Sequence, residues 1–111
     1  MYASNTAHLV WNSAIAKHIK KDFLQAGLPY SDLDEAWKII NPTRYKPRVA
    51  KEKILLISGK YDEFIMNEDS EGLWTSWGKP DRLVMPCGHS GLNVYRKPIS
   101  DAICRFVRKV L

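Results

Sequence analysis

An aspartate and a histidine follow two short apolar runs in the second half of this 111-residue chain. Asp62 follows the run Ile54–Ser58, and His89 follows the run Leu83–Met85. A helical pattern lies between the runs, which predicts a strand–helix–strand unit with parallel strands. Because such strands end at the same edge of a sheet, we expect the Asp62 carboxylate to meet Nδ1 of His89. There it would fix the tautomer and stabilise the imidazolium that forms when Nε2 takes a proton.

Each of the two residues has a simpler explanation on its own. An aspartate after a strand commonly stabilises a turn, and a histidine beside a glycine is an ordinary loop residue. Their occurrence together, on consecutive parallel strands, favours acid–base chemistry instead. Asp62 and His89 would then be two members of a Ser-His-Asp triad.

The nucleophile of such a triad is missing from the sequence. A serine of this class sits in Gly-x-Ser-x-Gly on a strand-to-helix elbow upstream of the acid, and no serine here has that context. Ser58 lies too close to Asp62 to form a separate elbow, and Ser90 follows the acid. We therefore expect no serine-hydrolase turnover from this chain alone.

The N-terminal part of the chain has helical patterns. Apolar residues recur every four positions over residues 6–26, and Gly27 is a natural C-terminal cap. A second, shorter helix is predicted from Ser31, which resembles a capping box with Asp34, and it ends before Pro42. The apolar stripes of the two helices are formed by Trp11, Ile15, Ile19 and Phe23, and by Leu33, Ala36, Trp37 and Ile40.

After a basic connector, the rest of the chain is predicted to alternate between strands and helices. The unbroken apolar run at 54–58 is typical of a strand covered on both faces of a parallel sheet, and 83–85 is the second strand. Between them, Asn67 is predicted to cap a helix that runs to roughly Trp77 and is closed by Gly78. An amphipathic helix of about 13 residues ends the chain. Its apolar side is formed by Ile99, Ala102, Ile103, Phe106, Val107 and Val110.

The composition indicates a single folded domain. The hydrophobic fraction is 45% and the chain has 4 Trp, 5 Tyr and 3 Phe, which argues against disorder. No stretch approaches the roughly 18 apolar residues of a membrane-spanning helix. Residues 1–5 show neither the basic nor the apolar region of a signal peptide. We therefore expect a cytoplasmic protein.

The charged and sulfur-containing residues exclude several functions. The net charge is +5, but the cations are interleaved with apolar residues at helical spacing, which indicates solvated helix faces and makes nucleic-acid binding the weaker hypothesis. Cys87 and Cys104 are expected to be reduced and buried. Together with the three histidines they do not have the spacing of a zinc site. We predict neither a metal nor a cofactor.

From about Lys53 to Leu111 the chain resembles the C-terminal part of an α/β-hydrolase. The resemblance rests on the segments 55–62 and 83–91 and on the closing helix. In that family the acid follows the penultimate strand and the histidine follows the last one. The resemblance therefore implies that Asp62 is the triad acid and His89 the general base, in the family's order of Ser, Asp, His.

The N-terminal helices are similar to the helical cap that often lies between nucleophile and acid in such enzymes. The resemblance thus divides the chain into a cap-like segment, 1–48, and the C-terminal part of the α/β core, 49–111. It implies that His8 and Trp11 line or frame the substrate pocket, although both also suit an amphipathic helix. Aromatic residues of the cap hint at a hydrophobic acyl or aryl substrate: Trp11, Phe23, Trp37 and Tyr45.

Three hypotheses on function follow. The first is a C-terminal fragment of a serine-type α/β-hydrolase, whose intact parent cleaves a carboxylic ester, thioester or amide. The second is a non-catalytic assembly module, because a sheet of two parallel strands leaves a bare apolar edge. That edge would pair in a homodimer or with an N-terminal segment made separately. The third, a basic nucleic-acid binder, predicts salt-dependent binding of oligonucleotides.

Overall fold

The structure, a computed structural model, describes residues 5–111 and shows a mixed α/β chain. Its two strands, β1 (Leu55–Gly59) and β2 (Asp81–Met85), form a parallel sheet. The described α-helices are α1 (Thr6–Asn12), α2 (Lys17–Gln25), α3 (Tyr30–Trp37), α4 (Asn67–Ser76) and α5 (Arg96–Val110). The predicted α/β class and the parallel strand–helix–strand unit are confirmed.

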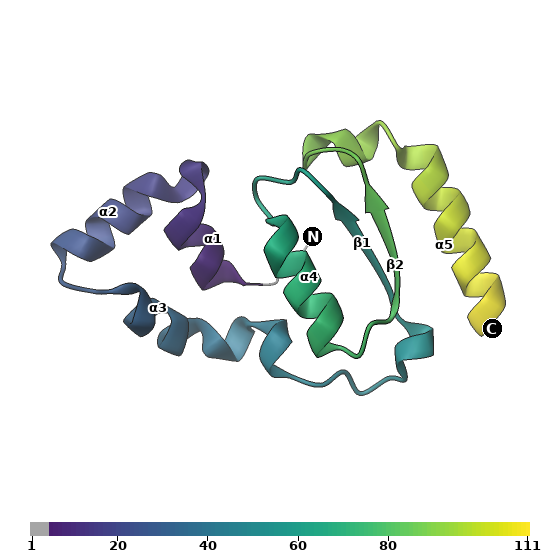
Figure 1. The fold of residues 1–111 in the computed structure, drawn as a ribbon, viewed down its shortest axis with the longest axis horizontal. Helices are drawn as coiled ribbons and strands as arrows, with labels where there is room; N and C mark the ends of the chain where they lie inside the picture. Colours follow the sequence, from purple (N-terminus) through teal and green to yellow (C-terminus); the bar gives the residue numbers. More distant parts are fainter. Residues whose placement is uncertain (1–4) are drawn as a thin grey trace.

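The sheet lies between two helices. In Figure 1, α4 lies on one side of the two strands and α5 on the other, while α1, α2 and α3 form a separate group beyond α4. Leu55 stands opposite Asp81 and Gly59 opposite Met85. The two strands therefore end together at one edge, where the loops that follow them meet.

The strands are less covered than the sequence predicts. β1 starts one residue later than the apolar run, and its residues from Leu55 to Ser58 are only half-buried. A helix lies on each face of the strand, as the sequence predicts, but the cover is incomplete. The reason is visible in the topology, because each strand pairs only with the other in the described part of the chain. One edge of β1 is therefore left open.

The predicted N-terminal helix over 6–26 is broken into two. At Ser13 the backbone is extended (ψ 134°), and its N–H closes α1 by donating to the carbonyl of Leu9 at 2.9 Å. A short 3₁₀ turn, Ala14–Ala16, then leads into α2. The apolar period of four residues continues across the break. A tertiary contact accompanies the break, since Ser13 is buried and its Oγ lies 3.5 Å from the carbonyl oxygen of Glu63.

The predicted helix caps are only partly correct. No capping box forms at Ser31, since α3 begins one residue earlier, at Tyr30, with Pro29 at the cap position. Asn67 is the first residue of α4 and Met66 is the capping residue, without a side-chain hydrogen bond. Gly27 and Gly78 do end their helices, with positive φ of 73° and 78°, a conformation that glycine adopts freely.

The last helix is confirmed, and it is longer than predicted because it begins at Arg96. It leaves one side open, where Ile103 and Val107 are 42% and 41% exposed. Cys104 is exposed on α5 and Cys87 is half-buried. The expectation of two buried thiols was therefore wrong. It assumed that an apolar surrounding in the sequence means a covered position, and α5 is covered on one side only.

The chain is elongated and has a small core. Its radius of gyration is 15.8 Å, against about 13 Å for a compact domain of this length. Ala7, Val10 and Leu33 form the buried cluster of the helical group. The predicted division at residue 48 falls in the connector between two 3₁₀ turns, Pro42–Arg44 and Lys51–Lys53. No helix in the described range is long and apolar enough to cross a membrane.

Candidate functional site

The loops after β1 and β2 bring an acid and a histidine into contact. Nδ1 of His89 lies 2.9 Å from Oδ2 of Asp62. Asp62 is buried, with a side chain 4% exposed, whereas the side chain of His89 is 30% exposed. The buried carboxylate therefore holds the imidazole, and part of the ring remains accessible to solvent. The expected meeting of these two side chains is present in the structure.

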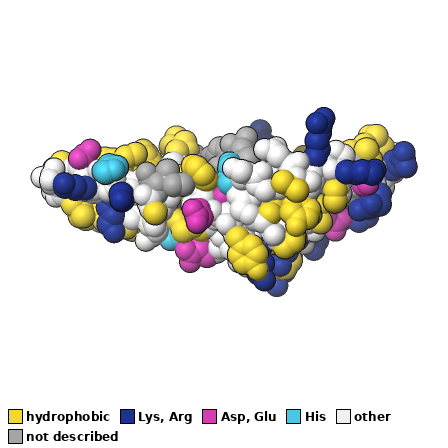
Figure 2. All heavy atoms as spheres, turned by 90° about the horizontal axis from the view of Figure 1, so that it is seen from above, with side chains coloured by type: hydrophobic (Ala, Val, Ile, Leu, Met, Phe, Trp, Pro, Cys, Tyr) yellow, Lys and Arg dark blue, Asp and Glu magenta, His cyan; other side chains and the backbone are white. Residues whose placement is uncertain are grey.

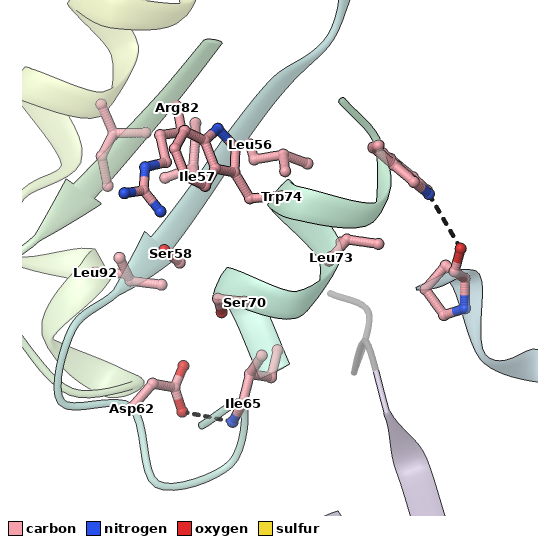
Figure 3. A pocket seen from close by; sticks show the side chains of 13 residues that line it. Leu56, Ile57, Ser58, Asp62, Ile65, Ser70, Leu73, Trp74, Arg82 and Leu92 are labelled. Carbon is pink, nitrogen blue, oxygen red and sulfur yellow. Dashed lines mark hydrogen bonds between the residues drawn. The ribbon is translucent and has the colours of Figure 1, made fainter. Parts of the chain in front are cut away.

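Asp62 is fixed by its own loop as well. Its Oδ1 accepts hydrogen bonds from the backbone N–H groups of Phe64 at 2.8 Å and Ile65 at 3.0 Å. Figure 3 shows the second of these bonds and the carboxylate at the turn below β1. Asp62 thus stabilises its own turn through Oδ1 and contacts His89 through Oδ2.

The hydrogen bonds of Asp62 determine the tautomer of His89. An ionised carboxylate can only accept, so Nδ1 must carry the proton that lies between it and Oδ2. Nε2 is then the nitrogen with the free lone pair. Among the described residues, Nε2 of His89 has no hydrogen-bond partner. The acid thus orients the imidazole and leaves Nε2 as the nitrogen that could accept a proton.

A glycine allows the two loops to approach each other. A Cβ built on Gly59 would lie 2.6 Å from the carbonyl oxygen of Cys87, which no real side chain tolerates. The same carbonyl accepts the N–H of Tyr61 at 3.1 Å. The end of β1 therefore packs directly on the loop that carries His89, and this close contact requires a glycine at position 59.

An aromatic side chain that sequence reasoning missed lies against the histidine. The rings of Phe64 and His89 are 4.7 Å apart between centroids, with an angle of 44°. Phe64 is 42% exposed, so its ring borders the site and solvent at once. Its position two residues after Asp62 is a usable signal, because an aspartate turn receives the N–H of that residue.

Two cavities meet at Asp62. The first, of about 550 Å³, is mostly apolar and lies along β1 and α4. In Figure 3 the Trp74 ring lies over the Arg82 guanidinium, and Leu73 and Ser70 come from the same helix. Its walls are formed by Pro42, Leu56, Ile57, Ser58, Asp62, Ile65, Ser70, Leu73, Trp74, Trp77, Arg82, Leu92 and Ile99.

The second cavity is a polar cleft between the helical group and the loop after β1. It has a volume of about 700 Å³. One wall comes from Asn12, Ser13 and Ala14, and the other comes from Tyr61, Asp62, Glu63, Met66, Asn67 and Glu68. This cleft therefore lies between the end of α1 and the loop that carries Asp62.

His8 and Trp11 lie in different surroundings from the acid–histidine pair. His8 binds α4, with Nδ1 at 3.0 Å from Oδ2 of Asp69 and Nε2 at 3.5 Å from Oε1 of Glu68. Trp11 packs on Tyr30 in the helical group, at 5.7 Å between centroids. Burial raises the pKa of the Asp69 carboxyl and the hydrogen bond from His8 opposes this rise. A substrate-binding role for His8 and Trp11 stays a prediction.

The cations are spread over the chain, and one of them, Arg82, lines the first cavity. Figure 2 shows Lys and Arg side chains most densely toward the two ends of the long axis, and Asp and Glu side chains both near the middle and at the ends of that face. In the sequence these ends are Lys17, Lys20 and Lys21 of α2 and Arg105, Arg108 and Lys109 of α5. The described residues contain no group of three or more His, Cys, Asp or Glu side chains placed to hold a metal ion.

Comparison with known proteins gives one relevant relative. The chain is 38% identical over 110 residues to a protein of Bacillus subtilis (strain 168) described as "Uncharacterized protein YdjC". The matched segment covers 99% of this chain and 95% of the relative. No protein-family model matches the chain. No solved structure matches it.

Proposed function

The chain belongs to the same family as the Bacillus subtilis protein YdjC, and we propose that it is the C-terminal part of a serine-type α/β-hydrolase. In this proposal Asp62 orients His89, and His89 Nε2 takes the proton of a serine nucleophile carried by another polypeptide segment. The reaction is hydrolysis of a carboxylic ester, thioester or amide through an acyl-enzyme. The chain alone has no turnover, because no serine elbow is present in its sequence.

The hydrogen bond of 2.9 Å between His89 Nδ1 and Asp62 Oδ2 carries the proposal. It joins residues 27 positions apart in the sequence, on loops that leave adjacent parallel strands. The carboxylate is buried and the imidazole is half-exposed, so the free nitrogen is available to a proton donor. A turn aspartate needs no histidine on its second oxygen, which favours a catalytic role over a purely structural one.

The two cavities support a binding site beside this pair. The polar cleft lies between the helical group and Asp62, and the apolar cavity reaches Asp62 from the other side. An acyl or aryl group would enter the apolar cavity, and the polar part of the substrate would lie under the cap-like segment. In this proposal His8 and Trp11 contribute to the substrate site only because they lie on α1, the helix that borders the cleft.

A chimeric enzyme tests the proposal. Residues 53–111 replace the corresponding C-terminal segment of a complete serine α/β-hydrolase that keeps its own elbow serine. We expect hydrolysis of an activated ester, and a loss of about 10⁴-fold or more when Asp62 or His89 is replaced. The control is Asp101→Asn, which neutralises an exposed acid on α5 away from both cavities and should leave the turnover unchanged.

A folded chimera with activity that survives His89→Ala would contradict the proposal. If the chimera does not fold, the tautomer of His89 in the unmodified chain gives a separate test. A nitrogen NMR spectrum that shows the proton on Nε2 at neutral pH would also contradict the proposal. An in-frame Gly-x-Ser-x-Gly in the DNA before the Met1 codon would identify the source of the nucleophile.

The second candidate is an assembly module without catalysis, and the open edge of β1 favours it. In the described chain the strand has one partner, β2. Esterase activity of the chimera separates the two candidates, since an assembly module has no need for a functional His89.

A further inference from the structure

We propose that Phe64 is a positioning residue that holds the plane of the His89 imidazole and leaves Nε2 free. The inference rests on the proposed function, because the plane of the ring matters only if His89 moves a proton. The rings of Phe64 and His89 lie 4.7 Å apart between centroids, at an angle of 44°. Aromatic rings attract each other in tilted arrangements at about 4.5–7 Å, so this contact is favourable.

The hydrogen bond to Asp62 does not fix the imidazole on its own. It joins one ring atom, Nδ1 of His89, to Oδ2 of Asp62 at 2.9 Å, and a ring held at one atom can still pivot about that atom. Such a pivot displaces Nε2, which lies away from the held nitrogen. Proton transfer needs the two heavy atoms within about 2.6–3.2 Å of each other. A base with a fixed Nε2 therefore requires a second contact on the ring.

The carboxylate that holds the imidazole also places Phe64. Oδ1 of Asp62 accepts the backbone N–H of Phe64 at 2.8 Å and that of Ile65 at 3.0 Å. The Asp62 side chain is 4% exposed, so this anchor is enclosed by the protein. One oxygen of Asp62 thus sets the position of the imidazole, and the other sets the position of the residue that packs on it. The two rings meet because they share one buried anchor.

A phenyl ring can restrain the imidazole without taking part in its hydrogen bonding. It has no strong hydrogen-bond donor or acceptor, so it leaves the lone pair of Nε2 unoccupied. A hydroxyl or amide donor against the imidazole would compete for this nitrogen. The chemistry of Phe64 therefore suits a contact that must orient a base and keep it available.

Core packing does not account for the position of Phe64. The residue is 42% exposed. Within the described residues, it belongs neither to the buried cluster of the helical group nor to the side chains packed against that cluster. The linings of the two cavities at Asp62 do not include it either. An apolar ring that borders solvent gains little from burial, so the contact with His89 is the specific one that the structure gives to this side chain.

NMR of the full chain with labelled histidine tests this proposal without any turnover. In the wild type we expect contacts between the ring protons of Phe64 and His89, and one dominant side-chain rotamer of His89. Phe64→Leu should raise the ratio of minor to major rotamer about 2- to 12-fold, the factor that corresponds to the loss of one aromatic pair. Phe64→Tyr keeps the ring and should restore the wild-type ratio, because the residue is 42% exposed and the added hydroxyl can reach solvent.

Two further measurements separate positioning from a role in the stability of the loop. In Phe64→Leu the proton of His89 should stay on Nδ1, because Asp62 is unchanged. The Ile65 amide should keep its protection from hydrogen exchange, since its acceptor is Oδ1 of Asp62 at 3.0 Å. The control is Tyr61→Leu, which removes a 62% exposed aromatic ring of the same loop and should leave the rotamers of His89 unchanged.

Unchanged His89 rotamers in a folded Phe64→Leu variant would overturn the proposal. Loss of Ile65 protection in that variant would overturn it as well, because Phe64 would then act through the stability of the loop. If the variant does not fold, the wild-type spectrum decides: contacts between the two rings support the proposal and their absence overturns it. An inactive chimera together with the expected rotamer shift would count against the proposed function alone. An active chimera with unchanged rotamers would count against Phe64 alone.

Discussion

One carboxylate oxygen of Asp62 faces Nδ1 of His89 at 2.9 Å, while the other accepts two backbone N–H groups of its own loop. The same side chain therefore shapes the loop after β1 and fixes the imidazole of the loop after β2. The position of the His89 imidazole and the stability of the loop after β1 therefore both depend on the buried carboxylate of Asp62. A change at Asp62 must affect both, whereas a change at His89 removes the base and leaves the loop bonds in place.

Replacement of Asp62 by Asn should invert the tautomer of His89. The Asn oxygen can still accept the loop N–H groups, so its amide nitrogen faces the imidazole and donates to Nδ1. The proton then moves to Nε2, and the base is lost. We expect nitrogen NMR at neutral pH to show the Nε2–H form, and urea unfolding to show a loss of about 1–3 kcal/mol for a weakened buried acceptor.

Glu63→Gln is the control for this substitution, because it neutralises the adjacent carboxyl, which is exposed. It should leave the tautomer unchanged and alter the free energy of unfolding by less than about 0.5 kcal/mol. An Asp62→Asn variant that keeps Nδ1 protonated would show that another group orients His89.

Two glycine substitutions should have opposite effects on stability. Gly59→Ala puts a Cβ 2.6 Å from the Cys87 carbonyl oxygen and forces the loops apart, at a cost of about 1–3 kcal/mol. Gly72→Ala lies within α4, where the new Cβ would meet no atom of the described residues within 4 Å apart from its chain neighbours and the helix's own backbone, and it should stabilise the helix by about 0.5–1 kcal/mol. Thermal unfolding of both variants measures the difference. Equal effects in the same direction would contradict the close contact at Gly59.

The buried carboxyl of Asp69 should make stability depend on pH. Burial raises its pKa above the ordinary 3.8, and the hydrogen bond from His8 offsets only part of the rise. The folded state then binds more protons than the unfolded state in the window above pH 3.8. Stability contributed by this group is present at lower pH and is lost as pH rises through the raised pKa.

The free energy of unfolding of the wild type, relative to Asp69→Asn, should therefore fall as pH increases across this acidic window. Urea unfolding at a series of pH values measures it. Asp101→Asn is the control, because Asp101 is exposed on α5, where its carboxylate pairs with Lys97 at 3.4 Å. A difference that grows with pH would mean that the pairing with His8 outweighs the burial of Asp69.

The sheet and the contact at its edge could be predicted from the sequence because the required signals are local. Gly59 ends an unbroken apolar run, and a strand–helix–strand unit has essentially one handedness. These facts bring the ends of the two strands together without knowledge of the rest of the chain. The ring of Phe64 against His89 was not predicted, because it depends on how the loop after Asp62 turns.

The helical group was predicted less well because its breaks depend on contacts between distant residues. At the break, Ser13 contacts Glu63, which is 50 positions away in the sequence, and periodicity carries no information about such a contact. The resemblance to a helical cap implies a substrate role for His8, which stays a prediction; its ion-pair partners in the structure are acids of the first turn of α4. A histidine three positions before an aromatic residue gives no sign of a distant acidic partner.

Replacement of His8 should loosen the helical group from the rest of the chain. His8 joins α1 to Asp69 and Glu68 of α4, so His8→Ala removes a link across the polar cleft. We expect faster hydrogen exchange in α1 and in the first turn of α4, and no change in α5. His18→Ala is the matched control, since His18 is exposed on α2. Equal exchange of α1 in the two variants would show that the helical group is held to α4 by contacts other than His8.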